Sequence, residues 1–310
     1  MDYKIEKKCN LINAYKREQN FYSKARIAFS ELLGYLNIGE FDKILLPAYI
    51  GWSSIEGSGV FDPIAEKKIY PIFYHMGNNL KIDVADCKNK IMETKAKAIL
   101  IIHYFGFPDE NVKMIINIAK KEGLVVIEDA AHAFFSDRVS GICGNDGDYT
   151  LYSLHKMLPF SEGGVLVSNG KKLPCKIEEV YYDYSQYDLN VIAKKRVSNY
   201  KKMVNLLDEY NNPHIKILYH DIVEGVIPQT LPVVLIGTDR YKVYLEMNKL
   251  GWGVVSLYHT MIPQLKNIEY QEECWLSEHI TNLPVHQDVE EKLIGEMINN
   301  FINVVNKHAN

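Results

Sequence analysis

Residues 124–132 read Leu-Val-Val-Ile-Glu-Asp-Ala-Ala-His, a short apolar run that closes on two carboxylates and a histidine. The run Leu124–Glu128 is typical of a buried strand. In an open α/β sheet, ligands bind at the carboxyl ends of the strands. This stretch therefore predicts a strand whose last residues lie at a binding site.

The sequence around this strand alternates helical and short apolar patterns. Further strands are expected at 43–46, 69–74, 98–102, 149–152 and 165–168, and helices at 25–36, 52–60, 84–93 and 109–122. Such alternation is typical of βαβ units around a mostly parallel sheet. The expected fold class is α/β, with a mostly parallel central sheet flanked by helices.

The pattern changes after about residue 170. Expected elements there are a long helix at 190–210, strands at 231–236 and 253–257, and helices at 239–250 and 290–306. This order predicts a smaller C-terminal α+β domain. We place the large domain at residues 1–200 and the small domain at residues 201–310.

Composition excludes several classes of protein. The chain has 310 residues, of which 47 % are hydrophobic and 24 % charged, and its net charge is −4. These values exclude a disordered chain, a coiled coil and a collagen-like chain. No basic stripe is present, which argues against nucleic acid as the main partner. The apolar stretches are too short to span a membrane, and no signal peptide is visible, so no membrane association is expected.

The cysteines and histidines argue against a metal centre. The five cysteines, at 9, 87, 143, 175 and 274, are scattered and odd in number. Buried or free thiols in a reducing cytoplasm are expected. No histidines have paired ligand spacing, which disfavours a metalloenzyme, so no metal ligand is predicted. No Gly-x-Gly-x-x-Gly follows a strand, which disfavours an NAD enzyme.

Asp129 is the first candidate site residue. A buried carboxylate is costly on its own, so a cationic partner is expected beside it. His132 follows three residues later and can reach the same ligand. The alternative interpretation is a helix cap at Asp129 and a histidine at the edge of the core at His132.

A second candidate site lies between Gly147 and Gly164. A strand delivers Ser153 and Lys156 into a turn, and the pair Gly163-Gly164 begins the strand back. Glycines let the backbone pass close to a ligand. A lysine held among apolar neighbours has a depressed pKa and can form a Schiff base. An ordinary exposed lysine in a turn is the alternative.

Two further segments each begin a predicted helix. Tyr22-Ser-Lys-Ala-Arg-Ile-Ala28 can bind phosphate through free backbone N–H groups; the alternative is a plain helix capped by Ser23. Pro47-Ala-Tyr-Ile-Gly-Trp-Ser-Ser54 supplies aromatic faces suited to stacking on a flat ring. The alternative for Tyr49 and Trp52 is packing in the core.

In this order the segments resemble the nucleotide-sugar aminotransferases of the DegT/StrS family. These are pyridoxal-phosphate enzymes with the aspartate aminotransferase fold (fold type I). The resemblance covers about Ser23 to Gly164 and part of the C-terminal half. It is carried by Leu45-Leu-Pro-Ala-Tyr49, Ile102-His-Tyr-Phe-Gly-Phe-Pro108, Val126-Ile-Glu-Asp-Ala-Ala-His-Ala133, Gly147-Asp148 through Ser153 to Lys156, Glu162-Gly-Gly164 and Leu283-Pro-Val-His-Gln-Asp288.

The resemblance implies catalytic roles for three residues. Lys156 would bind pyridoxal phosphate as a Schiff base and move protons at the substrate carbon. Asp129 would keep the pyridine nitrogen protonated, and His132 would lie near the ring hydroxyl or over the ring face. Some relatives are dehydratases that carry histidine in place of this lysine. Here Lys156 is present, directly after His155, which favours an aminotransferase.

The resemblance also implies which residues hold the cofactor. An aromatic residue of the segment Tyr49–Trp52 would stack on the pyridine ring, with Trp52 favoured over Tyr49. The backbone of Ala25, Arg26 and Ile27, with the Ser153 hydroxyl, would bind the phosphate. The large domain, residues 1–200, would thus be the cofactor-binding domain.

The chain also departs from the family pattern. It is shorter than typical members, and the difference falls between Ser168 and Lys194, where relatives carry a segment that reaches into the partner's active site. Lys24-Ala25-Arg26 stands where Ser-Gly-Thr is usual, and Ser153 lies closer to Lys156 than in many members. These departures indicate a divergent branch and leave the sugar acceptor open.

The function implied is amino transfer from an amino acid, with L-glutamate expected, to a keto-sugar linked to a nucleotide. The product would serve polysaccharide or natural-product biosynthesis. A homodimer is expected, because such sites are built at a dimer interface. Tyr258, His259 and His286 are candidate substrate contacts, with ordinary surface positions as the alternative. A pyridoxal-phosphate dehydratase, an aminotransferase for a non-sugar ketone and a non-catalytic descendant that binds the cofactor stay open as other functions.

Overall fold

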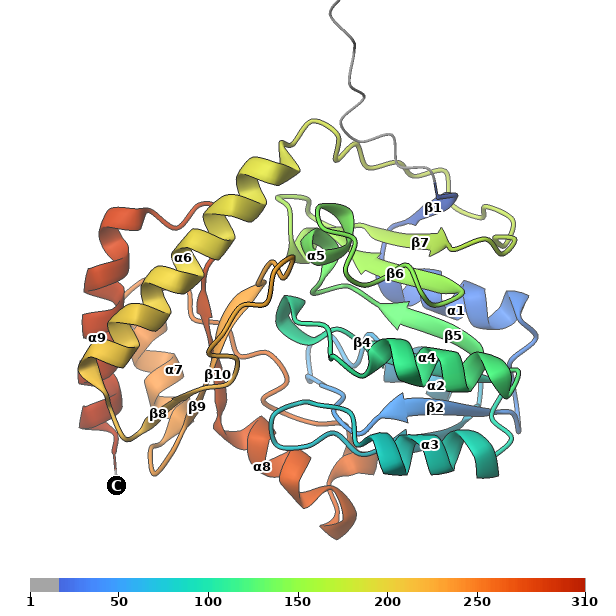
Figure 1. The fold of residues 1–310 in the computed structure, drawn as a ribbon, viewed down its shortest axis with the longest axis horizontal. Helices are drawn as coiled ribbons and strands as arrows, with labels where there is room; N and C mark the ends of the chain where they lie inside the picture. Colours follow the sequence, from blue (N-terminus) through green and yellow to red (C-terminus); the bar gives the residue numbers. More distant parts are fainter. Residues whose placement is uncertain (1–16, 310) are drawn as a thin grey trace, which may run out of the picture.

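A large sheet dominates the computed structural model, which describes residues 17–309 (Figure 1). Its order is β1-β7-β6-β5-β4-β2-β3. The strands are β1 (Gln19–Tyr22), β2 (Lys43–Pro47), β3 (Tyr70–Tyr74), β4 (Ala98–Ile102), β5 (Val125–Asp129), β6 (Tyr149–Ser153) and β7 (Gly164–Ser168). Strands β3, β2, β4, β5 and β6 are parallel, and β7 is antiparallel to both β6 and β1. The predicted mostly parallel central sheet is confirmed.

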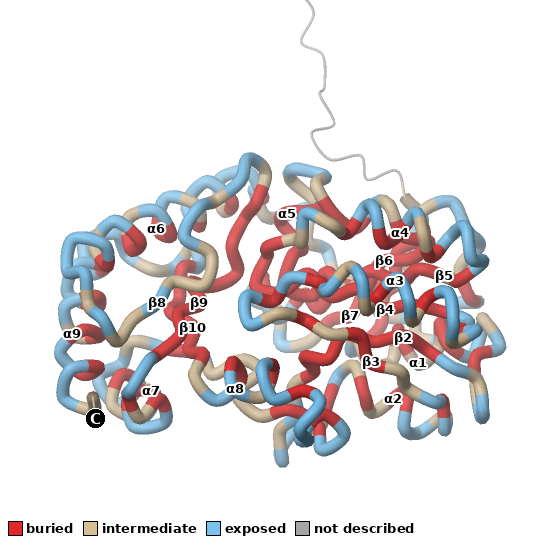
Figure 2. Tube along the Cα trace, turned by 60° about the horizontal axis from the view of Figure 1, so that its bottom comes forward, coloured by how far each residue is buried: buried red, intermediate tan, exposed pale blue. Residues whose placement is uncertain are grey.

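Helices cover both faces of this sheet. Figure 1 shows α3 (Val84–Glu93) and α4 (Val112–Lys121) in front of the sheet and α1 (Ala25–Tyr35) behind it. Helix α2 (Phe61–Glu66) packs against α1, and α5 (Phe134–Arg138) follows the end of β5. Strands covered on both faces are apolar throughout, and every residue of β4 and β7 is buried (Figure 2).

A second, smaller unit follows in the C-terminal part. Its three-stranded antiparallel sheet has the order β10-β9-β8. The elements are α6 (Leu189–Tyr210), β8 (Ile215–Ile217), β9 (Thr230–Leu235), α7 (Arg240–Lys249), α8 (Gln271–His279), β10 (Ile280–Pro284) and α9 (Ile294–Lys307). This confirms the smaller α+β part. The expected boundary after residue 200 falls inside α6, and the division into 1–200 and 201–310 stays a prediction.

Short 3₁₀ turns complete the described chain. They are η1 (Tyr104–Gly106), η2 (Leu154–Lys156), η3 (Pro263–Leu265), η4 (Ile268–Tyr270) and η5 (Glu291–Leu293). Two of them, η1 and η2, follow directly on β4 and β6. They therefore begin where a parallel sheet usually binds its ligand.

Two predicted elements were wrong. Residues 52–60 form no helix: the backbones of Ser53 and Gly57 bond to each other, and Gly57 has φ +67°. A helix cannot run through such a turn, so α2 begins only at Phe61. Residues 253–257 form no strand, because Gly253 has φ +62° and only Val255 makes a bridge, to Asn282 of β10.

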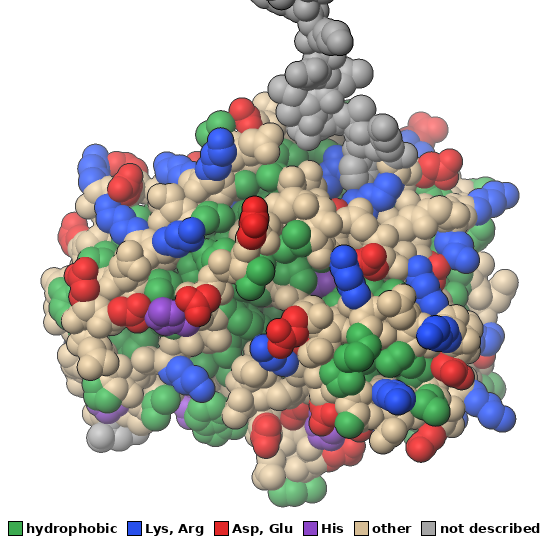
Figure 3. Space-filling view, in the orientation of Figure 1, with side chains coloured by type: hydrophobic (Ala, Val, Ile, Leu, Met, Phe, Trp, Pro, Cys, Tyr) green, Lys and Arg blue, Asp and Glu red, His purple; other side chains and the backbone are tan. Residues whose placement is uncertain are grey.

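The surface carries both signs of charge. Figure 3 shows Lys and Arg interspersed with Asp and Glu on the face in view. Among residues 17–309, no helix is both long and apolar enough to cross a membrane. The four described cysteines, Cys87, Cys143, Cys175 and Cys274, are free, and Cys9 lies outside the described residues. The same residues include no group of three or more His, Cys, Asp or Glu side chains that could hold a metal ion.

Candidate active site

The carboxyl ends of β4, β5 and β6 meet at one edge of the large sheet. Asp129, the last residue of β5, is in register with Ile102 of β4 and Leu151 of β6. β6 ends at Ser153, and the turn η2 then carries Lys156. The fold thus brings Asp129 and Lys156 to one edge, although 27 positions separate their numbers, 129 and 156.

Glu128 and Asp129 face opposite sides of β5, because successive side chains alternate along a strand. Glu128 is buried, bonds Nε2 of His103 at 2.8 Å, and accepts the N–H groups of Gly144 and Gly147 at 2.8 and 2.6 Å. Burial alone would raise the pKa of Glu128, but the hydrogen bond and charge of His103 and these N–H groups outweigh it, so the pKa is lowered. Glu128 therefore fixes the loop that leads into β6.

Lys156, His132 and Asp129 form a polar group of three. The Lys156 Nζ lies 3.2 Å from Nε2 of His132, which is 2 % exposed. Burial, and then the charge of Lys156, hold the pKa of His132 well below its ordinary value, so the imidazole is neutral. Burial also raises the pKa of Asp129, against the opposing effects of the Lys156 charge and of the Ala131 N–H that it accepts at 2.8 Å.

Lys156 is exposed as a whole residue, but its amine lies in a partly buried contact with His132. Desolvation of the amine lowers the pKa of Lys156, while the charges of Asp129 and Glu56 oppose the shift and Arg26 adds to it. A lysine with a lowered pKa is more often unprotonated and is therefore a better nucleophile toward a carbonyl carbon.

Aromatic rings enclose His132. Phe105 stacks on it with a centroid distance of 5.9 Å and an angle of 24°, and Tyr258 meets it edge-on at 5.5 Å. The Phe105 N–H donates to Nδ1 of His132 at 3.5 Å. This contact favours the tautomer that carries its proton on Nε2, which then donates to the Lys156 amine.

The N-terminus of α1 lies beside the turn that carries Lys156. The Ser23 carbonyl accepts the Gly163 N–H, and the Gly163 carbonyl accepts the Leu154 N–H, both at 2.8 Å. A Cβ on Gly164 would overlap the backbone of Lys24 and Ala25. The strand after the turn therefore passes as close to the start of α1 as glycine allows.

The predicted phosphate-binding residues lie at this point. Ala25 and Arg26 are the first residues of α1, where N–H groups have no acceptor within the helix. The Ile27 N–H is already engaged, because it donates to the Lys24 carbonyl at 3.1 Å. The Ser153 hydroxyl lies 3.3 Å from Nδ1 of His155.

Ser23 does not cap α1, contrary to the alternative interpretation. Its N–H and hydroxyl both donate to the carboxylate of Glu178, at 2.6 and 3.1 Å, and Lys24 occupies the N-cap position without a side-chain bond. The Arg26 guanidinium bonds the carbonyl of Glu56 at 2.7 Å and Asp62 at 3.3 Å. Its side chain thus ties α1 to the loop that follows β2.

The two aromatic candidates after β2 have different surroundings. Tyr49 is completely buried and its ring contacts Tyr104 and Tyr258, as the alternative of core packing states. Trp52 is 39 % exposed, and its backbone N–H donates to the carbonyl of Thr260 at 2.9 Å. Trp52 is therefore available at the strand end, and its stacking on a ring stays a prediction.

Sequence reasoning missed several residues near the site. Phe105 stood within a recognised motif, but no signal tied it to His132. Glu56 and Glu178 carried no signal, because isolated carboxylates in loops are usually solvated. Of the candidate substrate contacts, Tyr258 lies at the site, whereas His259 bonds the carbonyl of Ser256 and His286 lies on the loop after β10.

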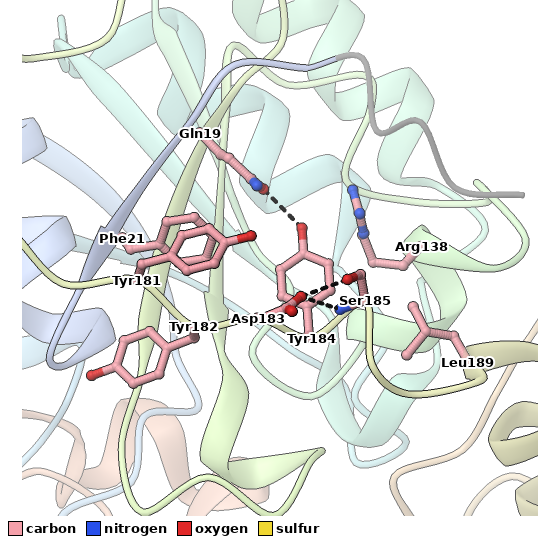
Figure 4. A pocket seen from close by; sticks show the side chains of 9 residues that line it. All are labelled: Gln19, Phe21, Arg138, Tyr181, Tyr182, Asp183, Tyr184, Ser185 and Leu189. Atoms are coloured by element: carbon pink, nitrogen blue, oxygen red, sulfur yellow. Dashed lines mark hydrogen bonds between the residues drawn. The ribbon is translucent and has the colours of Figure 1, made fainter. Parts of the chain in front are cut away.

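Two pockets of the described residues contain none of the predicted site residues. One, of about 220 Å³, lies between β1 and the segment before α6 (Figure 4). Its lining residues are Gln19, Phe21, Arg138, Tyr181, Tyr182, Asp183, Tyr184, Ser185 and Leu189. The other adjoins the end of α6 and β8. We place the active site by its reactive side chains, because neither pocket is lined by Lys156, His132 or Asp129.

The residues present fit pyridoxal phosphate. Lys156 is an amine of lowered pKa for the carbonyl group, and Asp129 is a partly buried carboxylate for a protonated ring nitrogen. The start of α1 offers N–H groups to an anion beside the same turn. The carbonyl group, the ring nitrogen and the phosphate of the cofactor thus each have a group of matching chemistry.

Comparison with known proteins agrees with this chemistry. A sequence model of the DegT/DnrJ/EryC1/StrS aminotransferase family matches residues 29–203. The chain is 32 % identical over 154 residues to GDP-perosamine synthase of Escherichia coli O157:H7. The matched segment covers 49 % of this chain and 40 % of the relative. The chain spans less than half the length of the curated relatives it matches.

Solved structures share the fold. PseC of Helicobacter pylori, an aminotransferase of pseudoaminic acid biosynthesis, matches with a TM-score of 0.73 and 17 % identity over 94 % of this chain and 87 % of its own. NtdA of Bacillus subtilis, solved with its cofactor PMP, matches with a TM-score of 0.73 and 16 % identity over 94 % and 74 %. The fold is therefore that of the type I pyridoxal-phosphate transferases, as predicted. Because the family model covers residues 29–203, more than half of the 310 residues, the chain belongs to the DegT/DnrJ/EryC1/StrS aminotransferase family.

Proposed function

We propose that the chain is a pyridoxal-phosphate-dependent aminotransferase. One observation carries this proposal: the Lys156 amine, with a lowered pKa, lies 3.2 Å from a neutral His132 at the strand end that presents Asp129. Family membership supports the same reaction class. The cofactor would supply a ring that withdraws electrons from the substrate carbon.

The three polar residues divide the work in this proposal. The unprotonated Lys156 amine would hold the cofactor and would move a proton at the substrate carbon. The Asp129 carboxylate holds a proton on the ring nitrogen. The neutral His132, with its proton on Nε2, orients the Lys156 amine.

The remaining predicted residues would hold the cofactor. The N–H groups of Ala25 and Arg26, with the Ser153 hydroxyl, would bind the phosphate, since they lie beside the turn that carries Lys156. The Ile27 N–H contributes less, because it is bonded to the Lys24 carbonyl. Trp52 would cover the ring from the loop after β2.

The proposed substrates are an amino-acid donor, L-glutamate, and a keto-sugar linked to a nucleotide. The similarity to GDP-perosamine synthase and to PseC supports a sugar acceptor. We further propose a homodimer. The resemblance to the family implies this assembly, whereas within the chain the segment before α6 bonds the start of α1 through Glu178 and Ser23.

Absorption spectroscopy tests the reaction class. Pyridoxal phosphate is added to the purified protein, and the visible spectrum is recorded before and after L-glutamate. We expect a yellow band that is absent in Lys156→Ala and is bleached by L-glutamate but not by D-glutamate. Lys88→Ala, which removes an exposed lysine on α3, serves as the matched control and should keep the band.

Each outcome assigns the function differently. A band that L-glutamate leaves unchanged would exclude glutamate as the donor and direct the search to other amino acids. No band in the wild-type protein would contradict the proposal and favour the non-catalytic alternative. Product analysis with keto-sugar nucleotides then separates amino transfer from dehydration, because only amino transfer leaves nitrogen in the sugar.

A further inference from the structure

A loop of the C-terminal part lies against the strand ends of the large sheet. The backbone N–H of Trp52 donates to the Thr260 carbonyl at 2.9 Å, and the backbone N–H of Ile262 donates to the Ile50 carbonyl at 3.0 Å. Gly51 and Met261 form a bridge between the same two segments. This pairing carries the residues before Thr260 to the edge where β2, β4 and β5 end.

Tyr258 is the residue of this loop that reaches the candidate site. Its ring lies 5.5 Å from His132 and 5.9 Å from Phe105, in edge-on contacts of 68° and 81°. Tyr49 and Tyr104 contact the same ring at 5.4 and 5.3 Å. The His132 imidazole is therefore held between the stacked face of Phe105 and the Tyr258 ring.

The backbone at Tyr258 is held in a conformation that non-glycine residues rarely adopt. Its φ is +55°, and its carbonyl accepts the Ser277 hydroxyl at 2.6 Å. Such a conformation persists only where the surroundings impose it, and it is concentrated at functional sites. The same residue places its ring against His132.

Gly51 provides the space for this ring. A Cβ on Gly51 would lie 2.9 Å from Cδ1 of Tyr258, closer than real Cβ contacts. The φ of Gly51 is not positive, so its lack of a side chain matters for space and not for backbone freedom. The Tyr258 ring therefore occupies the space that a side chain at position 51 would need.

We propose that Tyr258 is a positioning residue of the active site, which holds the His132 imidazole against the Lys156 amine from the C-terminal part of the chain. The catalytic meaning of this contact rests on the proposed function. The phenol stays protonated, because burial, and then the charge of Asp129, raise the pKa of Tyr258. Without the ring, His132 would keep Phe105 on one side only and could turn away from Lys156.

Two readouts test the proposal. The first is the affinity for pyridoxal phosphate, from titration of the visible band. The second is the NMR signal of His132 in the protein without cofactor, assigned with His132→Gln. Tyr258→Leu should weaken cofactor binding by about two- to tenfold, the size of an aromatic pair contribution, and shift the His132 signal. Tyr258→Phe should restore most of the lost affinity, because it keeps the ring.

Matched controls separate positioning from general stability. Tyr270→Leu removes another buried tyrosine of the C-terminal part, which contacts Phe73 and His75 instead of His132. It should leave both readouts unchanged. Gly51→Ala should reproduce the effects of Tyr258→Leu by displacing the ring, whereas Gly59→Ala adds a Cβ with open space around it and should have no effect.

The outcomes are distinguishable. An unchanged His132 signal and unchanged affinity in Tyr258→Leu, or equal effects of Tyr270→Leu, would overturn the proposal. If Tyr258→Leu does not fold, Gly51→Ala decides by the same two readouts. If the wild-type protein binds no pyridoxal phosphate, the proposed function fails, and the His132 signal in the cofactor-free variants still tests the contact.

Discussion

Asp129, His132 and Lys156 share one physical condition, which is the loss of hydrating water. Burial is the largest cause of the raised pKa of Asp129 and of the lowered pKa values of His132 and Lys156. All three shifts favour the uncharged form, so the folded chain bears a cost in free energy at this point. Titratable groups with shifted pKa values gather at functional sites for this reason.

Asp129→Asn tests the carboxylate. The amide keeps the shape of the side chain but removes the negative charge that opposes the shift at Lys156. We therefore expect the pKa of Lys156 to fall further, so that binding of pyridoxal phosphate begins at lower pH. The rate of the half-reaction with the amino-acid donor should fall by about 100-fold or more, the scale of a general acid–base group. Stopped-flow spectroscopy over a pH series measures both.

Glu128→Gln is the control for that substitution. Glu128 neighbours Asp129 but bonds His103 and the loop before β6. Loss of the Glu128 carboxylate should lower the free energy of unfolding without changing the pH at which Lys156 binds the cofactor. Equal pH profiles for Asp129→Asn and the wild type would remove Asp129 from the proposed role.

Residues close to a strand end were predictable, whereas contacts with residues brought in from afar were not: Tyr258 was expected as a substrate contact, not as a neighbour of His132. Asp129 ends β5, and His132 follows it by three residues. Lys156 likewise follows Ser153, the last residue of β6, by three residues. Ligands of a parallel sheet bind at such strand ends, so these three positions could be predicted directly. The contact of Tyr258 with His132 joins positions 126 apart (258 minus 132), and nothing local in the sequence encodes it. The hydrogen bond from Ser23 to Glu178 depends in the same way on the path of the chain after β7.

At the scale of elements, the contact between β7 and α1 sets the distance from the Lys156 turn to the helix N-terminus. Gly164→Ala would place a Cβ in overlap with backbone atoms of Lys24 and Ala25. Backbone atoms cannot shift as easily as the end of a flexible side chain. We expect a loss of about 1–3 kcal/mol in the free energy of unfolding, as in overpacked cores. Cofactor binding should weaken as well, because the start of α1 moves away.

Urea unfolding of the cofactor-free protein measures the first effect, and titration with pyridoxal phosphate measures the second. Gly39→Ala is the matched control, since its Cβ would meet nothing within 4 Å. If Gly164→Ala matched Gly39→Ala in both measurements, the close approach of β7 to α1 would have no energetic role.

Elements with a clear hydrophobic pattern were predictable, whereas short elements without one were not. The helix Val84–Glu93 and the strand Ala98–Ile102 have the expected bounds, because periodicity or a continuous apolar run specifies them. β1 and β8 were missed, since strands of 4 and 3 residues carry too little pattern. The false helix at 52–60 reflects turn chemistry, with Gly57 at φ +67°, that outweighed an apparent helical pattern.

At the scale of the whole molecule, α6 joins the two sheets. Arg196 of this helix is 2 % exposed and donates to the carbonyl of Met157, the residue after Lys156, at 3.2 Å. It also donates to the carbonyl of Gln229 at 3.2 Å and to Gln287 at 3.0 Å, both in the C-terminal part. Burial lowers the pKa of Arg196 to about 10, against the charge of Asp288. The side chain still carries its charge at neutral pH.

This placement predicts that the two sheets unfold together and that Arg196 couples them. Arg196→Met keeps an apolar stem but leaves the carbonyls of Met157 and Gln229 without their donor, and we expect a loss of about 2–4 kcal/mol in the free energy of unfolding. Lys195→Met, which changes an exposed neighbour on α6, should alter this free energy by less than about 0.5 kcal/mol.

Urea unfolding followed by circular dichroism and by tryptophan fluorescence measures both variants. A single transition in the wild type that splits into two in Arg196→Met would support the coupling, since the smaller sheet would then melt alone. Two separate transitions already in the wild type would contradict it, and would favour a real domain boundary near residue 200, within α6.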